Sequence, residues 1–415
     1  MSAASSPTVH RRRVFYIPGY DPIHPRRYRE LYRKEGAAQA AISGYEIALA
    51  PKQGKSGAPG RYGWHVTSTQ EGHRTTADVE VLVWSDIVRD SMGASIGATY
   101  WQLARTAFAY LASGALFRLM RLRKGPVIAA LYPIFALLLQ ALAGAGLGWA
   151  LAALALWALP DFPFDGLLGL ALAGATLIAC LRWFRAHDGR FYAYYLMHDY
   201  AFSARWGGAN PPALETRMAE MAEAIGRALA EDWDEVLVVG HSSGAHLGIS
   251  ILADLIRQGR VAPSPEKAPV LSFLTLGQVV PMVSYLPEAR RLRADLAYLS
   301  ARPELFWLDV TAPGDGCAFA LRDPVKVSGV APAGQIHPRI LSAAFTQTLS
   351  PARWAELRWR FFRLHFQYLC AFDRPGDYDY FRITAGPQTL AGRFAGRPSS
   401  KSRIETAANR FTTVA

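Results

Sequence analysis

The sequence predicts an α/β fold in which a mostly parallel sheet has helices on both faces and carries an inserted two-helix transmembrane hairpin. Three observations support this prediction. Short apolar runs alternate with helix-compatible stretches along most of the 415 residues. One of these runs ends directly in a serine between glycines. Two nearly charge-free stretches, each long enough to cross a bilayer as a helix, precede that serine.

The N-terminal part of the chain predicts strands on either side of a surface helix. Residues 14–17 form a buried strand that Pro18 and Gly19 end, and residues 25–43 suit a helix with mixed charge. Residues 44–86 predict several short strands, with turns at 52–60. The aromatic and apolar stretch 100–120 then predicts one helix.

The C-terminal part predicts a regular alternation of helices and strands. The expected helices are 190–204, 212–231, 244–257, 288–298 and 351–372, and the expected strands end near Gly240, Gly277 and Val310. Residues 391–415 are basic and rich in Gly, Ser and Thr, a composition typical of a disordered tail.

The apolar hairpin is predicted from length and charge. Residues 126–159 carry no formal charge, and one full crossing fits after Pro133; residues 166–183 supply a second crossing. The link at 161–165 contains no Lys or Arg, whereas both outer flanks are basic: Arg118, Arg121, Arg123, Lys124, Arg182, Arg185 and Arg190. The positive-inside rule therefore places the flanks in the cytoplasm and the link outside. The alternative is a buried helical hairpin in a soluble protein.

Charge and cysteine content narrow the classes of partner. The formal net charge of +12 suits an anionic membrane surface, and no nucleic-acid-binding motif accompanies it. The three cysteines, Cys180, Cys317 and Cys370, do not suggest a disulfide framework or the spacing of a metal site. We expect no metal and no nucleic-acid partner.

The run Gly240-His241-Ser242-Ser243-Gly244 has the G-x-S-x-G pattern of a nucleophile elbow. A strand-like run precedes it and a helix-compatible stretch follows it, and its glycines allow close backbone packing. Ser242 is the candidate nucleophile. The alternative is a glycine-rich strand-to-helix turn without chemistry.

A serine hydroxyl needs a histidine to take its proton and an acid to orient that histidine. Asp315 is the preferred acid because it lies between glycines in the loop after the strand 305–310; Asp323 and Asp309 are the alternatives. His365 is preferred as the base over His337. His241 and His246 come too early in the chain order, and His241 is expected to shape the elbow.

The oxyanion hole requires two backbone N–H groups. Ser243, next to the nucleophile, is expected to supply one. Tyr20 is expected to supply the other, because it follows the Pro18-Gly19 turn at the end of the first strand. The alternative is that Pro18 and Gly19 only end the strand.

These residues resemble the α/β-hydrolase superfamily, in the same chain order, over residues 14–20 and 235–368. The resemblance implies an esterase-, lipase- or thioesterase-like activity, with Ser242, Asp315 and His365 as the triad and no metal or organic cofactor. Two departures stand out. No His-Gly oxyanion motif is present, and the hairpin is unusual for soluble members.

The resulting hypothesis is an integral membrane serine hydrolase that cleaves acyl esters, lipids included, at the cytoplasmic face. Residues 1–125 and 186–390 form the hydrolase domain, 126–185 the hairpin and 391–415 the tail. One alternative is an acyltransferase with the same triad, and another is a non-catalytic membrane scaffold. A dehydrogenase is disfavoured because no G-x-G-x-x-G follows a strand. The acyl and alcohol specificities and the oligomeric state stay open.

Overall fold

The structure, a computed structural model, describes residues 8–21, 24–51, 61–93, 95–158, 165–263 and 269–414. The described strands form one sheet of eight strands in the order β2-β3-β4-β1-β5-β6-β7-β8. Their bounds are β1 Arg11–Ile17, β2 Glu46–Pro51, β3 Arg61–Gln70, β4 His73–Leu82, β5 Glu235–His241, β6 Val270–Leu276, β7 Leu305–Thr311 and β8 Arg339–Ser342. Every neighbouring pair from β4 to β8 is parallel, and only the pairs β2-β3 and β3-β4 are antiparallel. The predicted α/β class with a mostly parallel sheet is confirmed.

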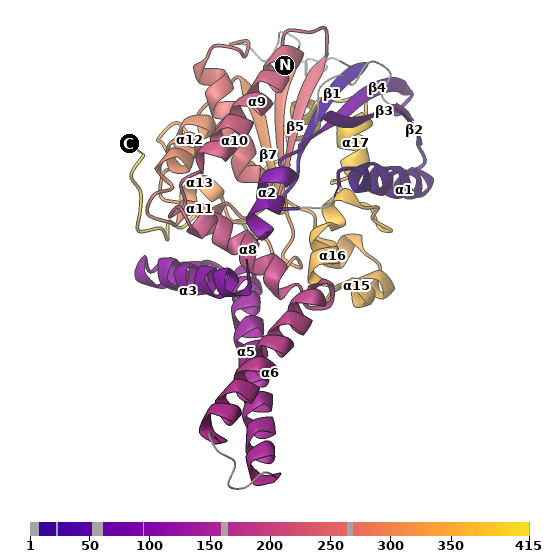
Figure 1. Ribbon diagram of the computed structural model, residues 1–415. Coiled ribbons are helices and arrows are strands. Elements are labelled where there is room, and N and C mark those ends of the chain that lie inside the picture. Colours follow the sequence, from indigo (N-terminus) through magenta and orange to yellow (C-terminus); the bar gives the residue numbers. More distant parts are fainter. Residues whose placement is uncertain are drawn as a thin grey trace.

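Helices connect and cover the strands (Figure 1). In the N-terminal half they are α1 Arg26–Ser43, α2 Ser85–Met92, α3 Ile96–Ala112, α4 Ala115–Leu122, α5 Lys124–Ala158, α6 Asp165–Ala186, α7 Asp188–Phe191 and α8 Ala193–Ala204. In the C-terminal half they are α9 Pro212–Ala228, α10 Gly244–Arg257, α11 Val280–Ser284, α12 Arg290–Ser300, α13 Pro324–Val327, α14 Phe345–Thr348, α15 Pro351–Leu357, α16 Phe361–His365, α17 Tyr380–Ala385 and α18 Leu390–Phe394, with a 3₁₀ turn at Gln367–Leu369.

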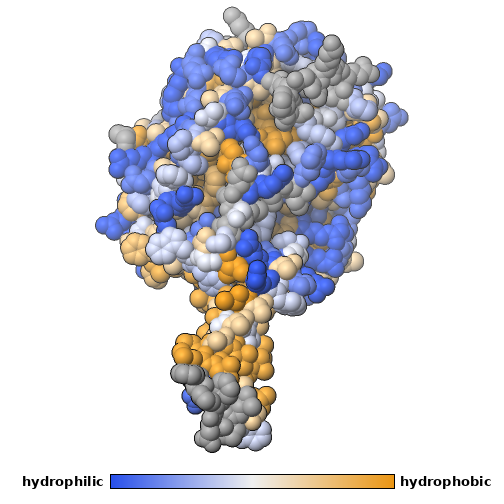
Figure 2. Space-filling model, in the orientation of Figure 1, coloured by the Kyte–Doolittle hydropathy of each residue, from blue (hydrophilic) through white to orange (hydrophobic). Residues whose placement is uncertain are grey.

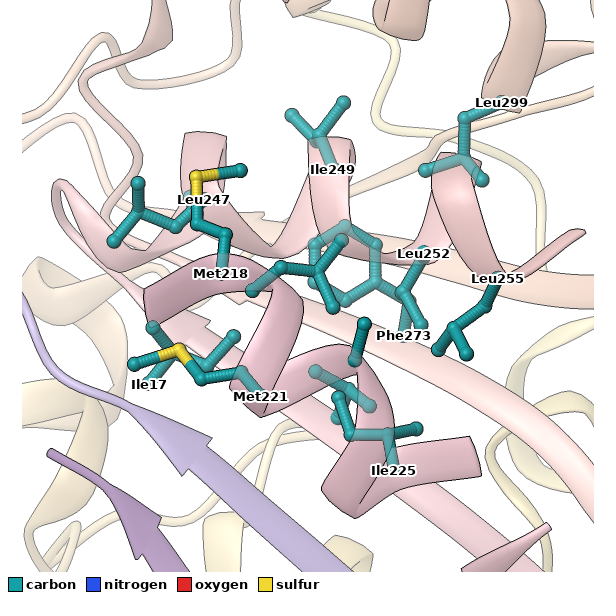
Figure 3. Close-up of a cluster of buried hydrophobic side chains, with 14 of the residues drawn as sticks. Ile17, Met218, Met221, Ile225, Leu247, Ile249, Leu252, Leu255, Phe273 and Leu299 are labelled. Carbon is teal, nitrogen blue, oxygen red and sulfur yellow. The ribbon is translucent and has the colours of Figure 1, made fainter. Parts of the chain in front are cut away.

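Alternating side chains of the central strands build two cores, one on each face of the sheet. On β5, Val236 and Val238 belong to one apolar cluster, and Leu237 and Val239 belong to the other. The first cluster packs against α9, α10 and α12; Figure 3 shows Met218, Met221 and Ile225 of α9 meeting Leu252 and Phe273 of α10 and β6. The second cluster packs against α1, α17 and α18. Helices therefore cover both faces.

The order of the strands determines where a site can form. The chain leaves β1 towards α1 on one face of the sheet, and it leaves β5 towards α10 on the opposite face. β1 and β5 are parallel neighbours, so the crevice beyond their carboxyl ends is a topological switch point, the usual place for a ligand in an open α/β sheet. Ser242 follows β5 and Gly19 follows β1, so both lie at this crevice.

Helices α5 and α6 form an apolar hairpin that projects from the body of the molecule, opposite the end that carries the N-terminus (Figure 1). Both helices are long and apolar enough to span a membrane. Small residues let them approach closely, because a Cβ at Gly148 would lie 2.6 Å from the carbonyl oxygen of Ala173. Their outer surface is hydrophobic (Figure 2), with Trp149 and Leu139 exposed. The predicted link at 161–165 and the turns at 52–60 lie almost wholly outside the described residues.

Several predicted segments differ from the structure. The helix expected over 351–372 is divided into α15, α16 and the 3₁₀ turn, because Arg360 adopts a non-helical ψ of 67°. The single helix expected over 100–120 is two helices, α3 and α4, because the chain bends at Gly114, which adopts a φ of 68°. Contrary to the expectation of a disordered tail, residues 391–414 pack on the domain. Ile404 forms a bridge with Arg322, and the carbonyl of Thr413 accepts a hydrogen bond from Arg293 at 2.9 Å. The basic composition of the tail concealed these pairings with distant parts of the chain.

Candidate active site

Ser242 occupies a strained turn between β5 and α10. Its φ of 56° is in the left-handed region that non-glycine residues rarely adopt, and such strain is typical of a nucleophile elbow. The flanking glycines are required by space: a Cβ at Gly244 would collide with the carbonyl of Ile17, and a Cβ at Gly240 would lie 2.7 Å from the carbonyl oxygen of Gly244. The turn thus presents the serine at the crevice between β1 and β5.

Asp315 and His365 form a hydrogen-bonded pair, as the chain order predicts. His365 Nδ1 lies 2.7 Å from Asp315 Oδ2, and both side chains are buried. Asp315 Oδ2 also accepts from the hydroxyl of Tyr368 at 3.0 Å, and Oδ1 accepts from the backbone N–H of Cys317 at 2.8 Å. Burial alone would raise the pKa of Asp315, but the His365 side chain and these donors outweigh burial and lower it. Asp315 is therefore a carboxylate that can orient the imidazole.

The second imidazole nitrogen of His365, Nε2, is buried and has no hydrogen-bond partner among the described residues. His365 and Ser242 line the same two cavities, and no hydrogen bond between them occurs in the described part of the chain. Hydrogen bonds between a nucleophile and its base are often long before substrate binds. The unpaired Nε2 is the atom available to receive the serine proton.

His241 positions the base instead of acting as one. Its Nε2 lies 3.0 Å from the carbonyl oxygen of His365, and its Nδ1 lies 3.2 Å from the hydroxyl of Tyr16. These contacts fit a neutral ring that donates from Nε2 to His365 and accepts at Nδ1 from Tyr16. Burial lowers the pKa of His241 to about 3, which keeps the ring neutral. The expectation that His241 shapes the elbow was too narrow, because its contacts reach the backbone of His365.

The loop after β1 closes over the elbow. A Cβ at Gly19 would lie 3.0 Å from Ser242 Cβ, so only glycine lets this loop approach. The hydroxyl of Tyr195, on α8, donates to the carbonyl of Tyr20 at 2.7 Å and holds the loop in place. Ser243 stands at the N-cap of α10, where the first N–H groups of a helix have no partner within the helix. Tyr20 and Ser242 line the same cavity, and Ser243 follows Ser242 directly; the oxyanion role of the two N–H groups stays a prediction.

Arg123 holds the loop that contains Asp315. Its guanidinium donates to the carbonyls of Pro313, Asp315 and Ala318 at 2.7, 2.8 and 2.8 Å. The sequence suggested that Arg123 is only one of the positive charges beside the hairpin. It stands directly before α5, so the root of the hairpin is fixed to the acid loop. This contact joins residues far apart in the chain, and the only signal in the sequence is a lone arginine next to an apolar segment.

Asp199 is a second acidic group that the sequence did not indicate. It lies on α8 and lines both cavities that contain Ser242 and His365. Burial raises the pKa of Asp199 to about 7, and the nearby His365 opposes that rise. Asp199 therefore keeps its proton to a higher pH than an exposed aspartate does.

The alternative acids and base have other roles. Asp309, inside β7, accepts a hydrogen bond from Thr275 Oγ1 at 2.6 Å. Asp323 caps α13 by accepting from the N–H groups of Val325 and Lys326. The ring of His337 packs edge-on against Phe306 and lines none of the cavities that contain Ser242.

A cavity of about 1100 Å³ opens beside Ser242, large enough for a lipid-sized ligand. We call it the entrance cavity. Its walls come from α1, from the end of α6, from α8 and from α15 and α16. Many of its lining side chains are charged: Arg27, Glu30, Arg33, Lys34, Glu35, Arg185, Asp188, Arg353 and Arg363. The candidate nucleophile therefore lies beside a cavity whose lining includes many charged side chains and the end of α6.

Asp315, Cys317 and His365 have donor atoms within 4.8 Å of one another, a spacing that can hold a metal ion. The chemistry of these donors argues against that use. Burial raises the pKa of the Cys317 thiol well above its usual value, and a protonated thiol is a poor ligand. Asp315 already accepts hydrogen bonds at both oxygens. The geometry is that of an acid–histidine pair.

Comparisons with known proteins add no relative: no protein-family model, curated protein or solved structure matches this chain. The argument for function therefore depends on the site.

Proposed function

We propose that this protein is a membrane-anchored serine hydrolase of the α/β-hydrolase type that cleaves carboxylic esters through Ser242, His365 and Asp315. The observation that carries the proposal is that a strained serine lines the same two cavities as the histidine of a buried Asp–His pair, whose Nε2 has no partner among the described residues. The parallel sheet with this serine after β5 supports the superfamily assignment.

The groups present suffice for an acyl-enzyme mechanism. Ser242 Oγ attacks the ester carbonyl carbon while His365 Nε2 takes the hydroxyl proton. The N–H groups of Ser243 and Tyr20 stabilise the oxyanion. When the intermediate collapses, the bond to the alcohol oxygen breaks and His365 returns the proton to the leaving alcohol. Water, activated in turn by His365, attacks the acyl-enzyme and releases the acid and free Ser242.

The membrane part of the proposal is supported by the shape and surface of the hairpin. Its outer residues include Trp149, Leu139 and Leu170, all more than 60% exposed, a costly arrangement in water. Helix α3 lies crosswise at the root of the hairpin (Figure 1) and exposes Trp101 and Phe108. Aromatic residues favour the interface between lipid and water. With α5 and α6 spanning the bilayer and their basic flanks in the cytoplasm, the site faces the cytoplasmic surface.

Labelling with a fluorophosphonate probe in detergent tests the proposal. We expect labelling of the wild type and none of Ser242→Ala, with the same yield and the same behaviour in size-exclusion chromatography. Ser243→Ala should still be labelled, because that residue is assigned only a backbone role. Labelling that disappears in Ser243→Ala but persists in Ser242→Ala would move the nucleophile. A folded wild-type protein that is never labelled would favour the non-catalytic scaffold.

Labelling does not separate a hydrolase from an acyltransferase, since both form the acyl-enzyme. Product analysis does. We expect free acid as the main product even when a primary alcohol is added in excess. Predominant transfer to the alcohol would instead assign the acyltransferase.

A further inference from the structure

Two further cavities continue from Ser242 towards the hairpin. The first, of about 80 Å³, has Ser242, Ser243 and His365 in its lining, together with Asp199 and with Tyr110, Tyr200 and Met282; we call it the inner cavity. The second, of about 160 Å³, lies among α3, α4 and α5, and we call it the apolar cavity. Tyr110, Tyr200 and Met282 line both, so these three side chains form the partition between them.

The apolar cavity is suited to hydrocarbon. Its lining contains no charged residue, and its members are Thr106, Ala107, Tyr110, Leu111, Leu116, Leu119, Val127, Ala130, Leu131, Ile134, Tyr200 and Met282. The hydroxyl of Tyr110 is already used, since it donates to the carbonyl of Met282 at 2.9 Å. Water in such a space would find few of the polar partners that it needs. An alkyl chain has no hydrogen bonds to satisfy in this cavity, and its transfer out of water is favourable.

The entrance cavity differs because charged side chains stand among its apolar ones. Arg27 and Arg33 on α1, Arg185 at the end of α6 and Arg363 on α16 all line it. An ester held at Ser242 therefore meets a cavity with charged groups on one side, and the apolar cavity, which has none in its lining, lies beyond the inner cavity.

We propose that the inner and apolar cavities bind the acyl chain of the substrate and that the entrance cavity binds its alcohol portion, so that the substrate is a long-chain acyl ester with a polar alcohol. This inference rests on the proposed role of Ser242. It also assigns Tyr110, Tyr200 and Met282 as specificity-determining residues. The chain passes the partition when the Met282 side chain turns aside, a movement that the unbranched, flexible methionine allows.

The position of the cavities fits this assignment. Ser243, whose N–H is assigned to the carbonyl oxygen, lines the inner cavity and not the entrance cavity. The apolar cavity lies beside the first turns of α5, at the root of the hairpin. The apolar end of the proposed acyl-chain path therefore lies at the root of the hairpin.

The test compares kcat/KM for p-nitrophenyl laurate and p-nitrophenyl butyrate in the same detergent. We expect the wild type to prefer laurate. Ala107→Phe fills the apolar cavity from α3 and should lower the laurate-to-butyrate ratio by about tenfold or more. Ala104→Phe is the matched control, because Ala104 is exposed on the same helix and lines neither cavity. Its ratio should equal that of the wild type.

Two more variants keep the test decisive. Ala130→Leu fills the same cavity from α5 and replaces Ala107→Phe if that protein does not accumulate. Met282→Ala opens the partition without removing the carbonyl that Tyr110 uses, and it should raise the ratio. A wild type that prefers butyrate, or equal ratios in the filling variants and the control, would overturn the acyl-chain assignment. Absence of both butyrate hydrolysis and probe labelling would instead refute the proposed function itself.

Discussion

Two buried carboxyl groups, one at the end of β7 and one in the loop that follows, have opposite electrostatic environments. Asp309 receives one hydrogen bond, from Thr275, and its Oδ2 has no partner among the described residues. Burial raises its pKa to about 8. Asp315 is equally buried, but His365, Tyr368 and Cys317 all donate to it and its pKa is lowered. Burial alone therefore does not produce a catalytic carboxylate; the surrounding donors do.

The largest expected effect is a loss of kcat that occurs when Asp315 is replaced and does not occur when Asp309 is replaced. Asp315→Asn should lower kcat for p-nitrophenyl butyrate by about 10⁴, because an amide leaves the imidazole in the wrong tautomer. Asp309→Asn should keep kcat close to that of the wild type, since Asp309 lines none of the cavities at Ser242. Similar losses of kcat in both variants would show that the different environments of the two carboxyl groups do not determine their roles in activity.

A smaller loss is expected when the loop that carries Asp315 is released. Arg123→Ala removes the donors to the carbonyls of Pro313, Asp315 and Ala318 and should lower kcat/KM by about 10², the typical cost of a misplaced catalytic group. Arg123→Lys keeps the charge without the planar fork and should recover only part of the activity. Full activity in Arg123→Ala would show that the loop holds its shape unaided.

Tyr368→Phe tests one donor to Asp315 and should cost about tenfold in kcat, the value of a single buried hydrogen bond. The ring and its packing against Phe345 are kept. The pH profile of kcat/KM should move with the substitution, because the hydrogen bond acts on the Asp–His pair. A loss of stability with unchanged kcat would mark the hydroxyl as structural only.

The smallest effect on activity, but a clear effect on stability, is expected for Asp309. In the unfolded chain this carboxyl ionises at about pH 4, whereas in the folded protein its pKa is about 8. The folded state therefore keeps a proton that the unfolded state loses. The stability from this difference is complete below about pH 4 and is lost as the pH rises through about 8.

Asp309→Asn should remove that pH dependence. We expect the Tm of the wild type to fall between about pH 5 and about pH 8 more steeply than the Tm of Asp309→Asn. Thermal unfolding of both proteins in one detergent, followed by tryptophan fluorescence, measures the difference. Parallel curves would mean that Asp309 is already ionised in the folded protein.

Much of the sheet could be predicted from local patterns. The alternation of apolar runs and helices predicted the parallel sheet, and the G-x-S-x-G run predicted a strand-to-helix turn at Ser242. The order of Asp315 and His365 along the chain was enough to select the two residues that the structure brings together. These features could be predicted because each depends on a short segment of sequence or on the order of segments along the chain.

The supports of the site could not be predicted in this way. Arg123, Tyr195 and His241 act through contacts with backbone carbonyls in distant loops. A backbone carbonyl accepts a hydrogen bond from any donor that lies near it, so these contacts have no recognisable pattern in the sequence. Asp199 reaches the site only because α8, which carries it, packs against α3 and α5. The bend at Gly114 was available from the sequence as a Ser-Gly pair, but the apolar periodicity on both sides concealed it.

The place of the hairpin in the chain has a consequence for synthesis. β1 pairs with β4 on one side and with β5 on the other, yet α5 and α6 are made between β4 and β5. During translation the edge of β1 that β5 will cover stays open until the whole hairpin has left the ribosome. With the hairpin delivered to the bilayer as proposed, the nucleophile and its histidine are made only afterwards. On the proposed function, the chain therefore gains its hydrolase activity only after the hairpin is in place.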